Sequence, residues 1–125
     1  MNVVDSSGWL EYFADEANAN FFAPAIENTR ELVVPAISLY EVFKRVHQQR
    51  GENDALKAAA QMAQGHVADV DLPLALRAAK LALEHRLPMA DSLILATARA
   101  YQATLWTQDD DFKDIAGVQY IEKRR

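Results

Sequence analysis

The chain of 125 residues has the length of one ordinary domain, and half of its residues are hydrophobic, as in a folded globular protein. It contains no cysteine, which excludes disulfides, zinc sites with thiolate ligands and cysteine nucleophiles. The net charge of −5 argues against a module that simply coats DNA, because such modules usually present a basic face.

The N-terminal residues lack the basic segment and the long apolar stretch of a signal peptide. Uncharged apolar runs also stay well short of the roughly 20 residues that a membrane span needs. We therefore expect one cytoplasmic domain over residues 1–125, without a membrane anchor.

Short apolar runs alternate with helical periodicity from the start of the chain. Residues 1–4 predict a buried strand that ends at Asp5, and the turn after it opens a helix with aromatic residues at helical spacing. A second helix is expected over 17–28 and a second strand over 32–34, closed by a proline. The next amphipathic helix runs to about Gln49.

The second half repeats this alternation with three helices and three strands. The expected ranges are 54–64, 74–85 and 88–101 for the helices, and 67–70, 104–107 and 118–121 for the strands. Short apolar strands separated by helices indicate a parallel sheet that is covered on both faces. The predicted fold class is therefore α/β, a three-layer sandwich with a short central parallel sheet.

Four acidic residues follow strands or begin the helices that leave them. Asp5 directly follows the first strand, and Asp109 follows the 104–107 strand by one residue. Glu41 lies early in the helix after the second strand, and Asp91 lies in the first turn of its helix. Because ligands gather at the carboxyl ends of parallel strands, we expect these acids to converge on one edge of the sheet.

Converging carboxylates would repel one another and raise their pKa values unless a cation joined them. Ligation by oxygen alone, without His or Cys, suits Mg²⁺ or Mn²⁺ rather than Zn²⁺. Mg²⁺ typically adds phosphate oxygens of a substrate to its protein ligands, so such a site favours phosphate-ester chemistry.

Each acid also has a simpler structural interpretation. Glu41 with Ser38 fits a helix capping box, and Asp91 could merely complement a helix dipole. Asp5 fits a helix-capping turn, and residues 109–111 fit a solvated turn that caps a short helical segment. The placement of all four acids at strand exits favours the metal site.

Four segments in these positions together resemble the acidic motifs of the PIN domain. They are VVDSS at 3–7, SLYEV at 38–42, LPMADSLILATA at 87–98 and TQDDDF at 107–112. The resemblance covers the whole chain, in motif order, and the spacing is similar to that of the single-domain toxins of VapBC-type toxin–antitoxin pairs.

This resemblance implies a Mg²⁺- or Mn²⁺-dependent endoribonuclease whose site acids are Asp5, Glu41, Asp91 and Asp109. Asp5 and Asp91 would be direct metal ligands, with the other two completing the site. Thr107 would brace the loop of the fourth motif by hydrogen bonding. The neighbours of Asp109, the acids at 110 and 111, lie within reach of the same loop.

The resemblance also implies partners: an RNA substrate, a cognate antitoxin and a second copy of the chain in a homodimer. Lys44, Arg45, Arg50 and the basic residues 123–125 either hold the RNA backbone near the site or are solvated charges. The aromatic residues of the first two helices are expected mainly in the core, with some lining a groove for the antitoxin.

Two alternative functions remain open at the level of sequence. A non-catalytic PIN scaffold would bind protein or RNA, although the chain keeps all four acids. A phosphoacceptor receiver domain has a similar length and an early Asp, but here Asp5 is followed by Ser6 rather than by a second acid.

Overall fold

The computed structural model describes residues 1–124 and contains five short parallel strands. Their bounds are β1 Asn2–Val4, β2 Val33–Pro35, β3 His66–Ala68, β4 Thr104–Thr107 and β5 Val118–Tyr120. Strand β4 lies between β1 and β5, and β2 pairs with β3. A bridge between Asn2 and Leu32 joins the two groups, so the strand order is β3-β2-β1-β4-β5.

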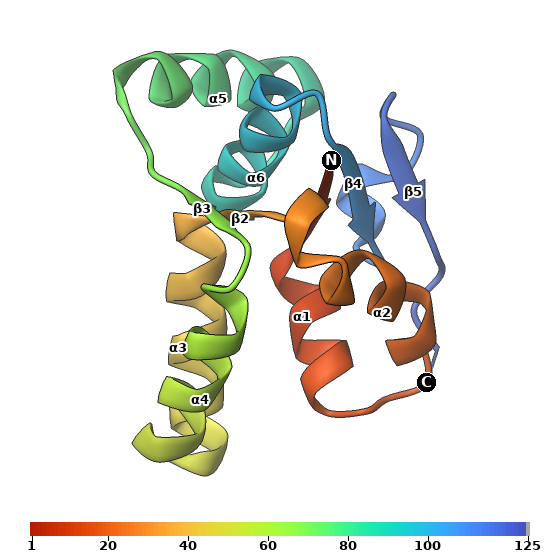
Figure 1. Ribbon diagram of the computed structural model, residues 1–125. Helices are drawn as coiled ribbons and strands as arrows, with labels where there is room; N and C mark the ends of the chain where they lie inside the picture. The colour runs from red at the N-terminus through yellow and green to blue at the C-terminus, as the bar shows by residue number, and fades with distance from the viewer. Residues whose placement is uncertain (125) are drawn as a thin grey trace.

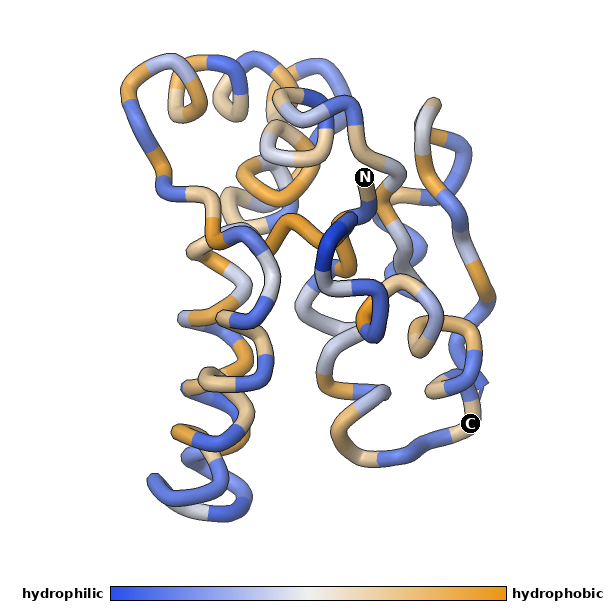
Figure 2. Tube along the Cα trace, viewed as in Figure 1, coloured by the Kyte–Doolittle hydropathy of each residue, from blue (hydrophilic) through white to orange (hydrophobic). Residues whose placement is uncertain are grey.

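Six α-helices connect and cover these strands (Figure 1). Their bounds are α1 Ser6–Phe13, α2 Ala19–Glu27, α3 Ala36–Arg50, α4 Glu52–Met62, α5 Leu72–His85 and α6 Met89–Ala100. Two 3₁₀ turns, Thr29–Glu31 and Asp110–Phe112, complete the regular structure. Helices α3 and α4 lie side by side as a hairpin whose far end projects from the sheet and is hydrophilic (Figures 1 and 2).

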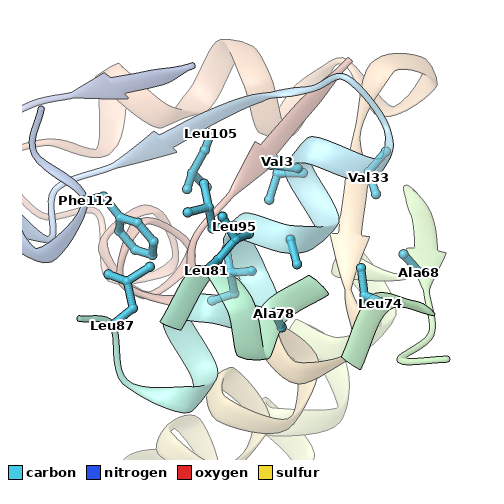
Figure 3. Close-up of a cluster of buried hydrophobic side chains, with 13 residues drawn as sticks. Val3, Val33, Ala68, Leu74, Ala78, Leu81, Leu87, Leu95, Leu105 and Phe112 are labelled. Atoms are coloured by element: carbon cyan, nitrogen blue, oxygen red, sulfur yellow. The ribbon is translucent and has the colours of Figure 1, made fainter. Parts of the chain in front are cut away.

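Alternate residues of the strands enter two cores on opposite faces of the sheet. Val3 and Leu105 face α5 and α6, where they pack with Leu95 and Phe112 (Figure 3). Val4 points the other way, into the core that α1–α4 form around Trp9. Because successive side chains of a strand point to opposite faces, this arrangement buries both sides of the sheet. The predicted three-layer α/β sandwich is confirmed.

Local sequence signals explain where several elements begin and end. Asp71 caps α5 by accepting a hydrogen bond from the amide of Leu74 at 2.9 Å, and Pro73 occupies the first turn as expected. Gly51, with a φ of +92°, makes the tight link between α3 and α4.

Some predicted boundaries were wrong by one to three residues. The second helix begins at Ala19 instead of residue 17, and the third strand is His66–Ala68 rather than 67–70. The second strand is Val33–Pro35 rather than 32–34, and Pro35, expected to close the strand, is instead its last residue and pairs with Ala68. Among residues 1–124, no helix is long and apolar enough to cross a membrane.

Candidate metal centre at the carboxyl edge of the sheet

Asp5 lies at the exit of β1 with its carboxylate fully enclosed by protein. It is 2% exposed and is the N-cap of α1, accepting a hydrogen bond from the amide of Gly8 at 3.0 Å. The hydroxyls of Ser7 and Thr107 also donate to it, at 2.9 and 2.8 Å. The capping interpretation of Asp5 is therefore correct, and it coexists with a place at the predicted edge.

Three other aspartates form a compact group beside Asp5. Oxygens of Asp91, Asp109 and Asp111 all lie within 4.8 Å of one another, so one cation could contact all three. Asp91 comes from the first turn of α6 and the other two come from the loop after β4. Asp109 also accepts a hydrogen bond from the amide of Asp111 at 2.9 Å, which is the expected capping turn.

Thr107 connects Asp5 to the loop after β4. Its hydroxyl donates to Asp5 Oδ2 at 2.8 Å and accepts from the amide of Asp109 at 2.9 Å. The bracing role expected for Thr107 is thus visible as two hydrogen bonds, and it joins residues 102 positions apart in the chain.

Glu41 stands apart from the three-aspartate group. Its Oε1 accepts a hydrogen bond from the hydroxyl of Ser6 at 2.6 Å, so it contacts the first turn of α1 next to Asp5. The capping-box interpretation of Glu41 was wrong: Ser38 lies inside α3, which begins at Ala36, and Pro35 occupies the N-cap position. The Ser38 hydroxyl is buried and has no hydrogen-bond partner within residues 1–124.

Burial and mutual repulsion raise the pKa values of the clustered acids. Burial, together with the charges of Asp109, Asp111 and Asp5, raises the pKa of Asp91 to about 8. Burial also raises the pKa of Asp5 to about 6, although the hydrogen bonds from Thr107, Gly8 and Ser7 oppose the shift. The pKa of Asp109 is raised mainly by burial.

This donor set fits a hard divalent cation. The grouped atoms are carboxylate oxygens, which Mg²⁺ and Mn²⁺ prefer. Within the described part of the chain, no Lys, Arg or His forms an ion pair with any of these acids. Charge at the cluster is thus left for a cation from solution to neutralise.

A cleft of about 480 Å³ between α1 and the α3–α4 hairpin adjoins this edge. Ser7 and Gln108 line both the cleft and the surroundings of Asp5. The walls of the cleft carry four basic side chains, Arg45, Arg50, Lys57 and Lys123, and three acidic ones, Glu11, Glu16 and Asp54. Lys44, which the sequence grouped with Arg45, lies instead in a separate apolar groove, 5.7 Å from the ring of Tyr40.

Sequence reasoning missed a buried polar network behind the acids. Glu11, Asn18 and Gln108 are each less than 10% exposed, and their side chains hydrogen-bond to one another. Polar residues in isolation give no signal of such an arrangement. The position of Gln108 inside the fourth motif, between Thr107 and Asp109, was the one available hint.

Comparison with known proteins places the chain in a family. A sequence model of the PIN domain matches residues 3–118. A comparison with curated proteins finds no significant match. The family match removes the receiver-domain alternative.

Solved structures share the fold over nearly the whole chain. A toxin–antitoxin complex from Klebsiella pneumoniae superposes with a TM-score of 0.79 at 23% identity, covering 95% of this chain and 96% of that one. VapC20 of Mycobacterium tuberculosis, described as a toxin that cleaves the sarcin-ricin loop, gives 0.76 at 18% identity, covering 93% and 95%. VapBC2 from Rickettsia felis, bound to a promoter DNA fragment, gives 0.73 at 16%, covering 97% of each chain.

Proposed function

The chain belongs to the PIN domain family, and from this premise we propose that it is a divalent-metal-dependent endoribonuclease acting as the toxin of a toxin–antitoxin pair. Its reaction is hydrolysis of RNA phosphodiester bonds. The observation that carries the proposal is the group of Asp91, Asp109 and Asp111, whose oxygens lie within 4.8 Å of one another without a basic partner among residues 1–124.

The acids would hold the cation from different positions. Asp91, Asp109 and Asp111 would each offer one oxygen to Mg²⁺ or Mn²⁺, and Asp5 would complete the site from its buried position behind them. Glu41 would contribute negative charge from beside the first turn of α1, where the hydroxyl of Ser6 holds its carboxylate. A bound divalent cation supplies an acidified water and neutralises charge that develops on the phosphate during hydrolysis.

The surrounding side chains hold these acids in place and control their protons. Thr107 fixes the distance between Asp5 and the Asp109 loop through its two hydrogen bonds. In the metal-free protein at neutral pH, Asp91 keeps a proton because its pKa is about 8. Asp91 would hold the cation as a carboxylate, so it would release this proton on binding.

The partners follow from the same family membership. We propose an RNA substrate whose backbone runs past Arg45 in the cleft and a cognate antitoxin that blocks this cleft, with the protein acting in the cytoplasm. Two of the similar structures are themselves toxin–antitoxin assemblies. We also propose a homodimer, since α5 presents Leu72, Leu76 and Leu83 to solvent at 73%, 60% and 86% exposure.

Cleavage of a structured RNA mixture by the purified chain tests the proposed activity. We expect cleavage with Mg²⁺ or Mn²⁺, none with EDTA, and a loss of at least about 100-fold in rate for Asp91→Asn. Asp69→Asn, at an exposed position after β3, is the matched control and should cleave like the natural chain.

Two outcomes would contradict the proposal. If folded, antitoxin-free protein cleaves no RNA with either metal, the non-catalytic scaffold becomes the better interpretation. If cleavage survives both EDTA and Asp91→Asn, the activity comes from a contaminant or from a different site.

A further inference from the structure

Three buried side chains close a ring of hydrogen bonds beside the acid site. Gln108 Nε2 donates to Glu11 Oε1 at 3.0 Å, and the backbone amide of Asn18 donates to Glu11 Oε2 at 2.9 Å. Asn18 Nδ2 then donates to Gln108 Oε1 at 3.0 Å, which closes the ring. We refer to Glu11, Asn18 and Gln108 as the polar ring.

The polar ring joins segments that are distant in the chain. Glu11 belongs to α1, Asn18 precedes α2, and Gln108 follows β4. Asn18 Nδ2 also donates to the carbonyl of Glu122 at 3.1 Å, so the segment after β5 is attached as well. Gln108 Nε2 makes a longer contact, 3.4 Å, with the carbonyl of Ser7.

The hydrogen bonds of the polar ring depend on the identity of each of its three side chains. All three side chains are at least nine-tenths buried, and no Lys or Arg in residues 1–124 pairs with the Glu11 carboxylate. A buried carboxylate is costly unless hydrogen bonds satisfy it, and here two N–H groups do so. An amide at 108 can donate to Glu11 and accept from Asn18 at once, whereas a carboxylate cannot donate.

Gln108 lies between two residues of the acid site. Thr107 on one side hydrogen-bonds to Asp5, and Asp109 on the other side belongs to the three-aspartate group. Fixing the side chain of Gln108 against α1 therefore fixes the backbone from which both neighbours project. Partners of this kind, which orient metal ligands without touching the metal, typically change metal affinity by about 10- to 100-fold when mutated.

We propose that Gln108 is a positioning residue that, through Glu11 and Asn18, sets the place of Asp109 and Thr107 relative to Asp5 and thereby the affinity of the site for its divalent cation. The inference rests on the proposed function, because it assumes that the acids bind a metal. The inference assigns a role at the acid site to an uncharged residue, which acts through hydrogen bonds and does not contact the metal.

A carboxylate–amide exchange within the polar ring tests this role. Gln108→Glu places two buried carboxylates against each other, and Glu11→Gln leaves amide groups without complementary partners. The double variant Glu11→Gln/Gln108→Glu restores one carboxylate and one amide in reversed positions, and Asn18 can still donate to both. Its net charge equals that of the natural chain.

Binding of Mn²⁺ to each folded protein, followed through the electron paramagnetic resonance signal of the free ion, is the measurement. We expect each single variant to bind Mn²⁺ roughly tenfold more weakly and the double variant to return to within about threefold of the natural chain. The weakening in Gln108→Glu opposes the effect of its added negative charge, which by itself would attract Mn²⁺ more strongly. Gln119→Glu, at an exposed position on β5, adds the same charge away from the ring and should not weaken binding.

The possible results separate the two proposals. If the natural chain binds no Mn²⁺, the proposed function fails and this inference fails with it. If the natural chain binds Mn²⁺ but the folded single variants bind equally well, or the folded double variant is not restored, the positioning role alone is overturned. Should Gln108→Glu fail to fold, Gln108→Met takes its place, because it removes the hydrogen bonds without adding charge, and unchanged Mn²⁺ binding by it overturns the role.

Discussion

Asp5 serves two purposes with one carboxylate. It caps α1 through the amide of Gly8 and lies at the edge where the other acids gather. Its hydrogen bonds lower its pKa while burial raises it more, so the metal-free protein holds this acid under electrostatic strain. One carboxylate is therefore both the observed cap of α1 and an acid of the proposed metal site.

The raised pKa values predict a stability that falls as pH rises. The folded protein keeps protons on Asp5 and Asp91 between the ordinary pKa of 3.8 and values of about 6 and 8, where the unfolded chain has released them. The free energy of unfolding therefore decreases between pH 4 and 8, with Asp5 alone contributing on the order of 3 kcal/mol.

Thermal melts in EDTA from pH 5 to pH 8.5 measure this loss. Added Mg²⁺ should raise the melting temperature, and more so at pH 8 than at pH 5.5, because it binds the deprotonated acids. Asp91→Asn should be more stable than the natural chain in EDTA at pH 8.5 and should lose the Mg²⁺ effect. A melting temperature that rises steadily with pH would contradict the raised pKa values.

Among single residues, the charged members of the candidate site could be predicted from the sequence better than the neutral ones. Asp91 and Asp109 could be proposed because a carboxylate at a strand exit or on an inward helix face needs a reason. Asp111 was only a neighbour in the same loop until the 3₁₀ turn placed it within reach. Gln108 had only its place inside the fourth motif as a hint and Asn18 had none, because their hydrogen bond joins residues 90 positions apart.

Among the secondary-structure elements, α3 separates two surfaces with different properties. Arg45 faces the cleft that adjoins the acid site, whereas Lys44 one residue earlier lies over Tyr40 in an apolar groove. Adjacent residues of a helix project about 100° apart, so their shared charge does not imply a shared role.

This separation predicts different effects of two neighbouring substitutions on RNA binding. In an Asp91→Asn background, which prevents cleavage, Arg45→Ala should reduce the slope of log affinity against log salt by about 0.7, the value for one phosphate contact on a single strand. Lys44→Ala should leave the slope unchanged. A slope for Arg45→Ala equal to that of the Asp91→Asn protein itself would contradict a contact between the cleft and the RNA backbone.

The contact between α1 and α2 depends on the missing side chain of Gly8. A Cβ at this position would lie 2.6 Å from a ring carbon of Phe22 and 2.7 Å from a methyl of Val4. We expect Gly8→Ala to lower the free energy of unfolding by about 1–3 kcal/mol, as overpacked cores do. Asn20→Ala, at an exposed position of α2, should change it by less than about 0.5 kcal/mol in the same denaturant titration.

Most elements were predictable because their periodicity reflects burial on one or both faces. The strand over 104–107 and the helix over 74–85 agree with the sequence expectation within two residues. The start of α3 was not predictable from Ser38, since a serine with a glutamate three residues later has the pattern of a capping box. In the folded protein, Ser38 is buried within α3, and Glu41 accepts a hydrogen bond from Ser6 instead of capping its own helix.

For the molecule as a whole, the outer face of α5 is an apolar helix face left in solvent. Leu72, Leu76 and Leu83 share one side of the helix by their spacing of four and seven residues. A second copy of the chain would cover this face in the proposed homodimer. Sedimentation equilibrium of Leu76→Glu/Leu83→Glu should then give a monomer, whereas Leu56→Glu, on the exposed side of α4, should stay dimeric.

Either of two results would count against this interface. The natural chain could sediment as a monomer at high concentration, or the α5 double variant could remain a dimer. In the second case the dimer would form through another surface, such as the apolar groove around Tyr40 and Phe43.

The strand order has a consequence for the stage of synthesis at which the acid site can assemble. A ribosome makes Asp5 102 residues before its partner Thr107, and Glu122, whose carbonyl accepts a hydrogen bond from Asn18, comes later still. Strand β4 must also enter between β1 and β5 before the edge exists. A chain whose synthesis stops before β4 therefore has no assembled acid site, so the proposed activity can arise only after the ribosome has made β4 and β5.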